Sequence, residues 1–506
     1  MKYVIIGGVA GGATAAARIR RIDELCEIIL IEKGSNISYA NCGLPYYIGG
    51  VISEREKLFL QTPDSFGTRF NIDVRIEHEA IAVEPENKIL KIKDLNGDEY
   101  TETYDKLLLS PGAVPFMPPI EGIDLKGIFT LRNVADTDAI KNYTTTHSIQ
   151  KAVVVGAGFI GLEMAENLHH TGAQVSIVER LNQVMPPIDL TMAAMVESHL
   201  VSKGVSLYLE KSVVAFNRKD NQIEIQLDDG STLLADIVIL SIGVRPATQL
   251  AEQAGLKIGE TKGMFVNEYL QTSNEDIYAV GDAIEFPHPI TGKPWMNFLA
   301  NPANRQGRIV ADNMVFGNKI PYEGAIGTAI AKVFDITVGS TGLAAKQLIR
   351  NEMPYLSSTT HSNSHAEYYP NASSLTIKLT FHPKTGTLYG AQCVGVEGVD
   401  KRIDQIALLI KKGGTVHDLI RLEHTYAPPF SSAKDPIAIA GYVANNIIIN
   451  KMPVVYWRDI KNNGNEKYTL LDVRTIDEFE LDAIPGSIHI PLEELRKRIN
   501  EIPEGK

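Results

Sequence analysis

Cysteine and tryptophan are scarce in this chain, with three and two copies among 506 residues. The three cysteines, Cys26, Cys42 and Cys393, stand far apart and do not make the disulfide framework that is typical of small secreted domains. Such sparing use of cysteine suits a reducing compartment, and we expect a cytoplasmic protein.

Long apolar runs are missing as well. No run of about 20 apolar residues occurs, so no transmembrane helix is expected. The apolar residues, 44% of the chain, can fill several cores, and the length predicts several domains. The net charge of −12 argues against nonspecific binding to nucleic acid or to anionic membranes. The N-terminus after Lys2 could pass for a signal peptide, but its glycines and the acid Glu32 fit a nucleotide-binding turn better.

The N-terminal segment predicts a strand, a glycine turn, a helix, a strand and an acid. The apolar run Tyr3–Ile6 precedes the turn Gly7–Gly12, and the apolar run Ile28–Ile31 ends at Glu32. In such a unit the glycines let the backbone approach a pyrophosphate, the helix N-terminus favours its charge, and the acid can bind a ribose. Val9 stands where the G-x-G-x-x-G pattern has its middle glycine, so an ordinary glycine-rich turn is the alternative.

A second glycine turn has the complete pattern. The run Ala152–Val155 is followed by Gly156–Gly161 with all three glycines in place, and Glu179 ends the next apolar run. The acid stands roughly 20 residues after the turn, as the dinucleotide fingerprint requires. An acid here favours the free 2′-hydroxyl of NADH, while Arg180 beside it leaves NADPH possible.

Two similar segments follow these turns. Lys106–Gly112 and Ile237–Gly243 are each an apolar strand that ends in a serine and a glycine, after a stretch that predicts a small β-meander. Further on, Ile277–Ala283 places an aspartate just after a short apolar strand, from which it could reach a ribityl chain. Each segment alone fits an ordinary strand and turn, and only their order along the chain indicates a function.

That order resembles the pyridine nucleotide–disulfide oxidoreductases over roughly residues 1–446. The resemblance implies an α/β protein with two Rossmann-like dinucleotide-binding domains, one inserted in the other, and an α+β dimerisation domain. It implies an FAD-binding domain at 1–118 and 247–322, an NAD(P)H-binding domain at 119–246 and an interface domain at 323–446. The implied cofactors are FAD and either NADH or NADPH, and no metal site is predicted. The residues implied at the cofactors are Gly7, Gly8, Ala10, Gly11, Gly12, Glu32, Ser110, Pro111, Gly112, Asp282, Gly156, Gly158, Phe159, Ile160, Gly161, Glu179 and Gly243.

Cys42 lies in the stretch Ser38–Tyr47 between the two turns. Many family members have a second cysteine five residues further on, but here that position is Tyr47, so no local disulfide can form. A lone redox cysteine forms either a mixed disulfide with an outside thiol or a sulfenic acid. A helix that starts near Gly43–Leu44 would favour the reactive thiolate.

The sequence around Asn41 and Cys42 resembles coenzyme A-disulfide reductases and their persulfide- and polysulfide-reducing relatives. Single-cysteine NADH oxidases and peroxidases usually carry a histidine in the first glycine turn, where this chain has Ala10. The resemblance therefore implies a flavoprotein that uses NAD(P)H to reduce coenzyme A disulfide, coenzyme A persulfide or polysulfide through Cys42. The alternatives are an NADH oxidase or peroxidase that cycles Cys42 through sulfenic acid, and a non-catalytic redox-sensing flavoprotein.

Coenzyme A carries several phosphate charges, so cations must line its site. The first helix supplies Arg18, Arg20 and Arg21, of which Arg18 and Arg21 are three apart and can share a face. A solvated basic helix face is the alternative. Some relatives have a lysine where Phe70 stands, and we expect Arg69 beside it to substitute. The coenzyme A contacts implied by the resemblance are Thr14, Arg18, Arg21, Ser38, Asn41 and Arg69.

Two later segments, His365–Pro370 and Thr425–Pro429, carry tyrosines. A thiolate that leaves a mixed disulfide needs a hydrogen-bond donor or a proton source. Tyr368 and Tyr426 match catalytic-site tyrosines that the partner subunit supplies in the family, and Tyr369 is the adjacent alternative. The resemblance therefore implies a homodimer that is active only as a dimer.

After Asn450 the chain changes character. The segments Tyr468–Arg474 and Ile484–Pro491 resemble the first half of a rhodanese domain, which we place at 455–506. A rhodanese acts through a cysteine in a later loop, and this tail has no cysteine, so we assign it no sulfurtransferase activity. About 50 residues with half a sheet are not expected to be stable alone, so we expect the tail to be partly disordered or docked on the body. The segment Asp400–Asp404 and the other two cysteines are predicted to be structural.

Overall fold

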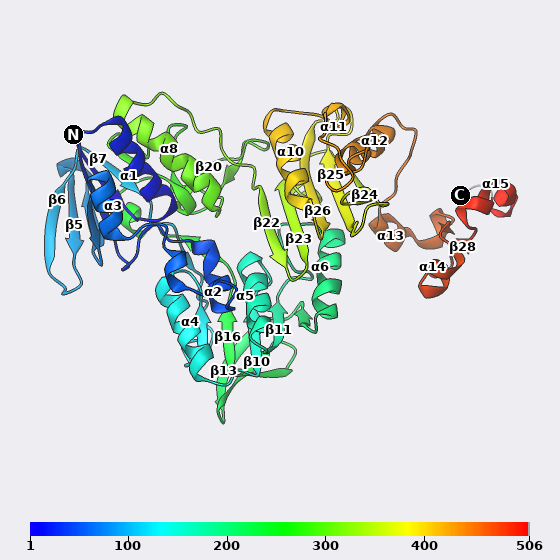
Figure 1. The fold of residues 1–506 in the computed structure, drawn as a ribbon, viewed down its shortest axis with the longest axis horizontal. Helices are drawn as coiled ribbons and strands as arrows, with labels where there is room; N and C mark the ends of the chain where they lie inside the picture. Colours follow the sequence, from blue (N-terminus) through cyan, green and yellow to red (C-terminus); the bar gives the residue numbers. More distant parts are fainter. Residues whose placement is uncertain (504–506) are drawn as a thin grey trace. The chain divides into compact units, whose positions relative to one another are not determined.

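The computed structural model describes residues 1–503, and the chain divides into two units, Met1–Ala444 and Asn445–Lys506. Three five-stranded sheets form the framework of the first unit. Two of them are parallel and the third is antiparallel, with helices between their strands (Figure 1). The predicted α/β fold class is therefore confirmed.

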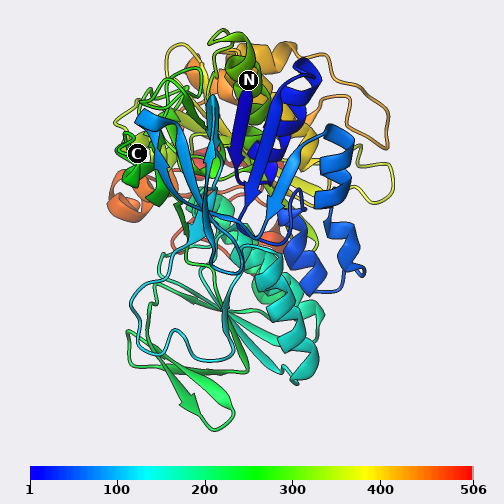
Figure 2. The ribbon, with the colours of Figure 1, turned by 90° about the vertical axis from the view of Figure 1, so that its left-hand side faces the viewer.

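The first parallel sheet has the strand order β19-β7-β1-β2-β3. Its strands are β1 (Lys2–Ile6), β2 (Glu27–Glu32), β3 (Asp73–Ile76), β7 (Lys106–Leu109) and β19 (Ile277–Ala279). β1 and β2 are apolar and buried almost throughout, as strands covered on both faces must be. Helix α1 (Ala10–Ile22) connects them and packs against α8 (Ala300–Phe316), and Figure 2 shows α1 beside the strands.

The second parallel sheet repeats this plan with the order β12-β11-β10-β16-β9. Its strands are β9 (Ile128–Thr130), β10 (Lys151–Val155), β11 (Gln174–Glu179), β12 (Ser206–Leu209) and β16 (Ile237–Leu240). The accompanying helices are α4 (Val134–Thr146), α5 (Phe159–His170) and α6 (Leu190–Ser202). Strand β19 of the first sheet follows this whole sheet in the chain, so the second sheet is inserted between strands of the first.

An antiparallel meander precedes β7 of the first sheet and β16 of the second, as the sequence predicts. The meanders are β4 (Glu79–Glu84), β5 (Ile89–Lys93) and β6 (Glu99–Thr103), and β13 (Val213–Lys219), β14 (Gln222–Leu227) and β15 (Thr232–Ala235). The two segments that connect the first and second sheets then pair with each other as the antiparallel strands β8 (Ala113–Pro115) and β17 (Val244–Pro246). The remaining short elements of this region are α2 (Leu44–Ile48), α3 (Pro63–Phe70), α7 (Gln249–Gln253), β18 (Met264–Phe265), β20 (Ile284–Pro287) and β21 (Pro294–Trp295).

The third sheet is antiparallel, with the order β22-β23-β26-β25-β24. Its strands are β22 (Ala329–Val333), β23 (Ile336–Gly342), β24 (Leu356–Asn363), β25 (Ser374–Phe381) and β26 (Leu388–Gly395). Its helices are α9 (Ala345–Arg350), α10 (Val399–Lys411), α11 (Val416–Arg421) and α12 (Pro436–Ile448). Helix α10 covers β23 and β26, and Cys393 is buried on β26 as predicted.

The second and third sheets are joined by two buried carboxylates. Asp189, just before α6, pairs with Lys378 at 2.9 Å and accepts a hydrogen bond from Nε2 of Gln392 at 2.9 Å. Burial opposes the charge of Asp189, yet Lys378 holds its pKa below the ordinary value. Glu166 on α5 pairs in the same way with Lys332 on β22, at 2.8 Å. Because a buried charge without its partner is costly, these pairs fix the second sheet against the third.

The second unit contains α13 (Trp457–Lys467), β27 (Leu471–Asp472), α14 (Ile476–Leu481), β28 (Ile488–His489) and α15 (Leu492–Arg498). β27 and β28 form a short parallel pair. Docking of this unit on the rest of the chain stays a prediction. Among the helices described here, none has both the length and the apolar character that crossing a membrane requires.

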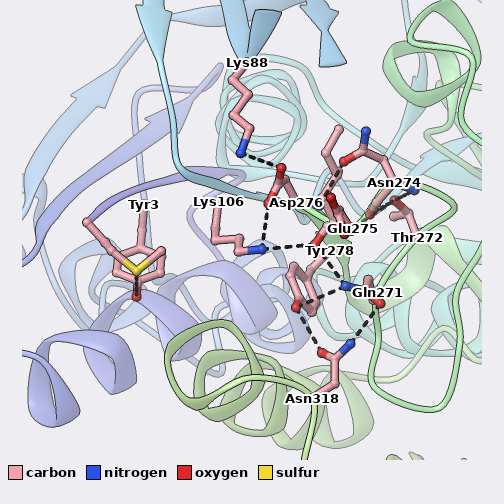
Figure 3. A network of polar contacts seen from close by, with 12 residues as sticks. Tyr3, Lys88, Lys106, Gln271, Thr272, Asn274, Glu275, Asp276, Tyr278 and Asn318 are labelled. Atoms are coloured by element: carbon pink, nitrogen blue, oxygen red, sulfur yellow. Dashed lines mark hydrogen bonds and ion pairs between the residues drawn. The ribbon is translucent and has the colours of Figure 1, made fainter. Parts of the chain in front are cut away.

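A polar network holds β19 in register beside β7 (Figure 3). Asp276, just before β19, lies between the ammonium groups of Lys88 and Lys106, with 2.7 Å to Lys106. In the same network, the hydroxyl of Tyr278 donates to the side chain of Asn318 at 3.0 Å. All three residues of β19 are buried, and these contacts secure this edge strand where the chain returns to the first sheet.

Asp276→Asn should lower the free energy of unfolding by about 1–2 kcal/mol at neutral pH, because two ammonium groups lose their shared anion. Burial opposes the charge of Asp276, but the hydrogen bonds from Lys106 and Lys88 lower its pKa. A carboxyl with a lowered folded-state pKa stabilises the fold above its unfolded pKa of about 3.9, and this stabilisation is lost as pH falls through the folded-state pKa.

Urea titrations of wild type and variant should therefore differ at neutral pH and converge in acid. Asp98→Asn, in the exposed turn between β5 and β6, is the matched control and should leave stability unchanged. A difference between wild type and Asp276→Asn that acid does not diminish would contradict this role.

Candidate functional site

The two glycine turns are built alike where each leaves its first strand. Gly7 and Gly156 have φ values of +94° and +101°, which L side chains rarely adopt. A Cβ on Gly7 would collide with the carbonyl of Ser110, and a Cβ on Gly156 would collide with that of Ser241. Both positions therefore require glycine for the same reason, the close approach of the strand that follows each meander.

The later glycines of the turns differ in what they require. A Cβ on Gly12 would collide with the carbonyl of Gly7, and Gly161 repeats this contact with Gly156. The middle glycine of the second turn, Gly158, has open space where a Cβ would be. A side chain is therefore sterically tolerated at this position, which explains why the first turn can carry Val9 there. The first N–H groups of helices α1 and α5, which have no partner within their helix, can donate to a pyrophosphate.

A glutamate ends the strand that follows each glycine turn and its helix, and it accepts hydrogen bonds from the backbone of that turn. Glu32 accepts a hydrogen bond from the N–H of Gly8 at 2.8 Å and another from Gly34 at 2.8 Å. Glu179 accepts one from Ala157 at 2.8 Å and another from Leu181 at 2.8 Å. Each carboxylate oxygen keeps a lone pair with which to accept from a ribose hydroxyl. The two glycine turns with their acids thus fit two dinucleotides.

The other cofactor-site residues predicted from sequence gather at the carboxyl ends of the parallel strands, where such sheets bind ligands. Ser110 follows β7, Gly243 follows β16 and Asp282 follows β19. The carbonyl of Pro111 accepts a hydrogen bond from Arg132 at 2.9 Å, a contact that the sequence did not reveal. Burial raises the pKa of Asp282 to about 6, although Arg132 lowers it.

Cys42 lies in a short 3-10 turn, Asn41–Gly43, directly before α2. Although this segment belongs in sequence to the first sheet, α2 packs against α4 and α5 of the second. Leu44, Ile48 and Leu58 are buried in the apolar core of that second sheet. The segment carrying the thiol thus belongs to one nucleotide-binding sheet and packs on the other.

Polar contacts secure the same segment. Arg55 binds the carboxylate of Asp138 on α4 through two hydrogen bonds of 2.8 and 2.7 Å. Lys141, one turn further along α4, donates to the carbonyl of Ile48 at 2.9 Å. Gly49 ends α2 against α5, and a Cβ there would collide with the side chain of Asn167.

The charges around Cys42 oppose ionisation. Part of the residue faces solvent, but burial of the thiol raises its pKa, and the carboxyls of Glu163 and Asp282 raise it further. Burial and the two carboxyls therefore outweigh the start of α2, and the expectation that this helix start would favour the thiolate is wrong. Helix α2 has only five residues, so its dipole is small beside two nearby acids.

Glu163 is the acidic residue that sequence reasoning missed. It lies on α5, two residues after Gly161, and burial followed by the neighbouring Glu166 raises its pKa to about 7. The available signal was an acid within a helix whose other residues are largely apolar. A carboxyl with such a pKa, close to a thiol, can hold or release a proton at neutral pH.

A cationic pocket lies between α1 and α8, with a volume of about 360 Å³. Four arginines contribute to it, two from each helix. Thr14 contacts Asn304 at 2.6 Å, and Arg18 forms two hydrogen bonds with Asp312 at 2.7 and 3.2 Å. The lining residues are Thr14, Arg18, Arg21, Asn301, Asn304, Arg305 and Arg308.

The contribution of α8 was missed, although its polar residues recur at helical spacing and could have been found. Positions 301, 304, 305 and 308 fall on one face of a helix. Of the three arginines on α1, Arg20 does not line the pocket. It is 5% exposed and donates to backbone carbonyls, including Phe70 at 2.9 Å. Arg20 is therefore structural, and the arginines predicted to contact coenzyme A on this helix, Arg18 and Arg21, do not include it.

The remaining predicted coenzyme A contacts lie beside the first turn or on α3. Ser38 has a φ of +47° and donates its N–H to the carbonyl of Gly8 at 2.8 Å. Asn41 is exposed next to Cys42. Arg69 is exposed on α3, and its guanidinium lies 5.4 Å from the ring centre of Phe70.

The two predicted tyrosines meet on the loops of the third sheet. The hydroxyls of Tyr368 and Tyr426 are 2.8 Å apart, although the residues are 76% and 49% exposed. This hydrogen bond raises the pKa of Tyr368. Tyr369 instead packs against His365, with ring centres 5.8 Å apart. Of the two adjacent candidates, Tyr368 is thus the one paired with Tyr426.

Comparison with protein families matches two regions of the chain. Residues 1–307 match the family described as pyridine nucleotide-disulphide oxidoreductase, and residues 328–436 match the dimerisation domain of the same family. Members of this family bind FAD and NAD(P)H.

Known relatives cover most of the chain. A protein named NADH oxidase from Methanocaldococcus jannaschii is 36% identical over 452 residues, 89% of this chain and 100% of the relative. A protein named coenzyme A disulfide reductase from Staphylococcus haemolyticus is 35% identical over 447 residues, 88% of this chain and 100% of the relative.

Two solved structures share the whole fold. The reduced CoADR-RHD of Bacillus anthracis has a TM-score of 0.97 and 49% identity, and the match covers 100% of this chain and 91% of that one. A NAD-dependent persulfide reductase from A. fulgidus has a TM-score of 0.93 and 38% identity, with 99% of this chain and 92% of that one covered.

Glu163→Gln should lower the pKa of Cys42, because it removes one of the two carboxyls that oppose the thiolate. Glu163 itself has a pKa of about 7, so it is largely neutral in acid and charged in base. The difference between variant and wild type should therefore grow as pH rises through neutrality. The rate of alkylation of Cys42 by iodoacetamide in the reduced enzyme, followed against pH, measures this.

Glu54→Gln is the matched control, since Glu54 is an exposed acid on the same segment and, among the residues the structure describes, forms an ion pair with the equally exposed Lys57. It should leave the alkylation profile unchanged. Identical profiles for wild type and Glu163→Gln would show that Glu163 does not influence the thiol.

Proposed function

The chain belongs to the pyridine nucleotide-disulphide oxidoreductase family, and we propose that it reduces coenzyme A disulfide, coenzyme A persulfide or polysulfide through Cys42. The observation that carries this proposal is the single thiol of Cys42. It has no second cysteine nearby, and its segment packs against the helices of the second parallel sheet. Relatives named coenzyme A disulfide reductase and persulfide reductase support the substrate class.

The proposed chemistry is thiol–disulfide exchange at one sulfur. The Cys42 thiolate attacks one sulfur of the substrate disulfide, forms a mixed disulfide with it, and releases the other sulfur as a thiolate. Bound FAD, reduced by NAD(P)H, would supply the two electrons that cleave the mixed disulfide. Cleavage leaves Cys42 and the second substrate sulfur as thiolates, which take up protons according to pH. The raised pKa of Cys42 and the nearby Glu163 favour holding a proton at this point of the cycle.

We assign the cationic pocket to the phosphates of coenzyme A. Arg21, Arg305 and Arg308 provide guanidinium groups there, and guanidinium binds phosphate strongly through charged hydrogen bonds. Arg18 contributes less free charge, because Asp312 neutralises it. We further propose a homodimer in which Tyr368 and Tyr426 of one subunit donate to the leaving thiolate at the Cys42 of the other.

The domain organisation is part of the same proposal. We assign 1–118 and 247–322 to FAD, 119–246 to NAD(P)H and 323–446 to dimerisation, in a cytoplasmic enzyme. We propose that 455–506 is rhodanese-like. Its support is the parallel pair β27–β28 and the stacking of His489 on Phe479, with ring centres 4.2 Å apart.

An NADH oxidase is the second candidate, and the relative from Methanocaldococcus jannaschii that bears this name favours it. In that reaction oxygen, once reduced to peroxide by electrons from NADH, would oxidise the Cys42 thiolate to a sulfenic acid and release hydroxide. The two functions differ in the electron acceptor, so turnover without oxygen separates them.

Cys42→Ser should lower anaerobic NADH turnover with coenzyme A disulfide by at least about 10³-fold, because a hydroxyl cannot form the mixed disulfide. Cys26→Ser is the matched control. Cys26 is 6% exposed and its sulfur donates to the carbonyl of Asp23, so this variant should keep its activity. Full anaerobic turnover in Cys42→Ser would overturn the proposal, and turnover that requires oxygen would favour the oxidase.

Arg308→Gln should raise the KM for coenzyme A disulfide by about 5- to 30-fold, the loss of about 1–2 kcal/mol from one phosphate contact. It should leave the KM for pantetheine disulfide unchanged, because that substrate lacks the nucleotide phosphates. Arg350→Gln, on the distant helix α9, is the control. Equal effects of Arg308→Gln on the KM of both substrates would contradict the assignment of the phosphates to this pocket.

A further inference from the structure

The largest fully buried side chain of the described residues is a charged one, Arg402 on α10. It is 1% exposed and pairs with Asp435, also 1% exposed, at 2.9 Å between Nη2 and Oδ2. A buried ion pair contributes little net stability compared with apolar packing, because both charges lose their hydration. Stability alone therefore does not explain why this buried ion pair is present.

The guanidinium of Arg402 reaches the base of the loop that carries Tyr368. Its Nη2 donates to the carbonyl of Ser364 at 2.9 Å, where the chain leaves β24. Ser364 closes this loop, since its N–H donates to the carbonyl of Ser373 at 2.8 Å and its hydroxyl accepts from the hydroxyl of Ser373 at 3.1 Å. His365 bridges the loop to the carbonyl of Pro370 at 3.1 Å.

The same ion pair reaches the base of the loop that carries Tyr426. The hydroxyl of Ser431 donates to Oδ2 of Asp435 at 2.6 Å and lies 3.4 Å from Nη2 of Arg402. Asp435 accepts the N–H of Ile437 at 2.9 Å, and so fixes the point where α12 begins. One guanidinium and one carboxylate thus bind the base of both tyrosine loops.

We infer that Arg402 and Asp435 are positioning residues for the tyrosine pair, and that they set the hydrogen bond between Tyr368 and Tyr426. This inference rests on the proposed role of the two tyrosines in protonating the leaving thiolate. Both hydroxyls lie at exposed loop tips, so nothing at the tips other than their mutual contact holds them in place among the bonds described here. The position of one loop tip relative to the other must therefore be determined at the bases of the two loops.

Lysine cannot replace arginine in this arrangement. The guanidinium donates at once to Asp435, to Ser364 and to the carbonyl of Gly398 at 3.1 Å, in the fixed directions of a planar fork. An ammonium group keeps the charge that Asp435 needs but cannot reach these acceptors together. Arg402→Lys therefore retains the ion pair and loosens the link between the loops.

Arg402→Lys should slow the step in which coenzyme A disulfide reoxidises the reduced enzyme by about 10-fold, the cost of a small misplacement of a reacting group. Reduction by NADH, which does not involve the tyrosines, should keep its rate. Tyr426→Phe should slow the same reoxidation step, and the double variant Arg402→Lys/Tyr426→Phe should be no slower than Tyr426→Phe alone. Stopped-flow absorbance separates the two half-reactions.

A spectroscopic measurement tests the geometry without turnover. The hydrogen bond raises the pKa of Tyr368, so its loss should make tyrosinate absorbance appear at lower pH. Arg402→Lys should shift the alkaline titration in the same direction as Tyr426→Phe. Lys401→Gln is the matched control, because Lys401 lies 3.8 Å from the same Asp435 and has no contact with either loop base among the described bonds.

Ser431→Ala serves as a second variant if Arg402→Lys does not fold, since it removes one contact to the ion pair and no charge. Additive effects of Arg402→Lys and Tyr426→Phe, or an unchanged titration and reoxidation rate, would overturn the inference. If Tyr426→Phe itself reoxidises at the normal rate, the proposed role of the tyrosines fails instead. The titration still shows in that case whether the ion pair sets the tyrosine contact.

Discussion

The contact between α2 and the helices α4 and α5 is the one on which the proposed chemistry depends. It takes a segment that the chain makes between strands of the first parallel sheet and buries its apolar residues in the core of the second. Cys42 precedes α2 directly, so this packing brings the thiol to the second sheet although its segment follows a strand of the first. A protein with two nucleotide cradles but without this contact would have no means of relating its thiol to both.

Electrostatics around the thiol follow from the same packing. Glu163 belongs to the helix after the second glycine turn, and Asp282 follows the last strand of the first sheet, yet both act on Cys42. The acids come from the two different sheets because the segment lies against both. Their charges favour the protonated thiol, so Cys42 must lose a proton before it attacks a disulfide, and the carboxyl of Glu163, with a pKa of about 7, can accept that proton.

The sequence was sufficient wherever a residue is required by its own backbone or its nearest strand. Gly7 and Gly156 were predictable, because a positive φ and a neighbouring carbonyl exclude any side chain. The order of glycine turns, meanders and serine–glycine strand ends predicted the fold class, since each feature depends on local spacing. The tyrosine pair followed from the family resemblance alone, and the structure adds the contact between the hydroxyls.

Residues whose role depends on distant packing were not predictable in this way. Arg18 and Arg20 stand on one helix, but Arg18 lines the cationic pocket and Arg20 is buried against backbone carbonyls. Arg402 lay in a segment predicted to be structural, and only the folded loops show what it joins. Glu163 required the approach of α2 to α5. Spacing along the chain cannot distinguish these cases, because tertiary contacts decide them.

The mass carried by Cys42 in the intact, non-reduced protein tests the central claim most directly. After exposure to coenzyme A disulfide, the peptide that contains Cys42 should gain the mass of one coenzyme A less two hydrogens, and NADH under anaerobic conditions should remove it. Peptides with Cys26 and Cys393, which are buried, should stay unmodified. A Cys42 that gains only oxygen, or an adduct that NADH does not remove, would contradict the account.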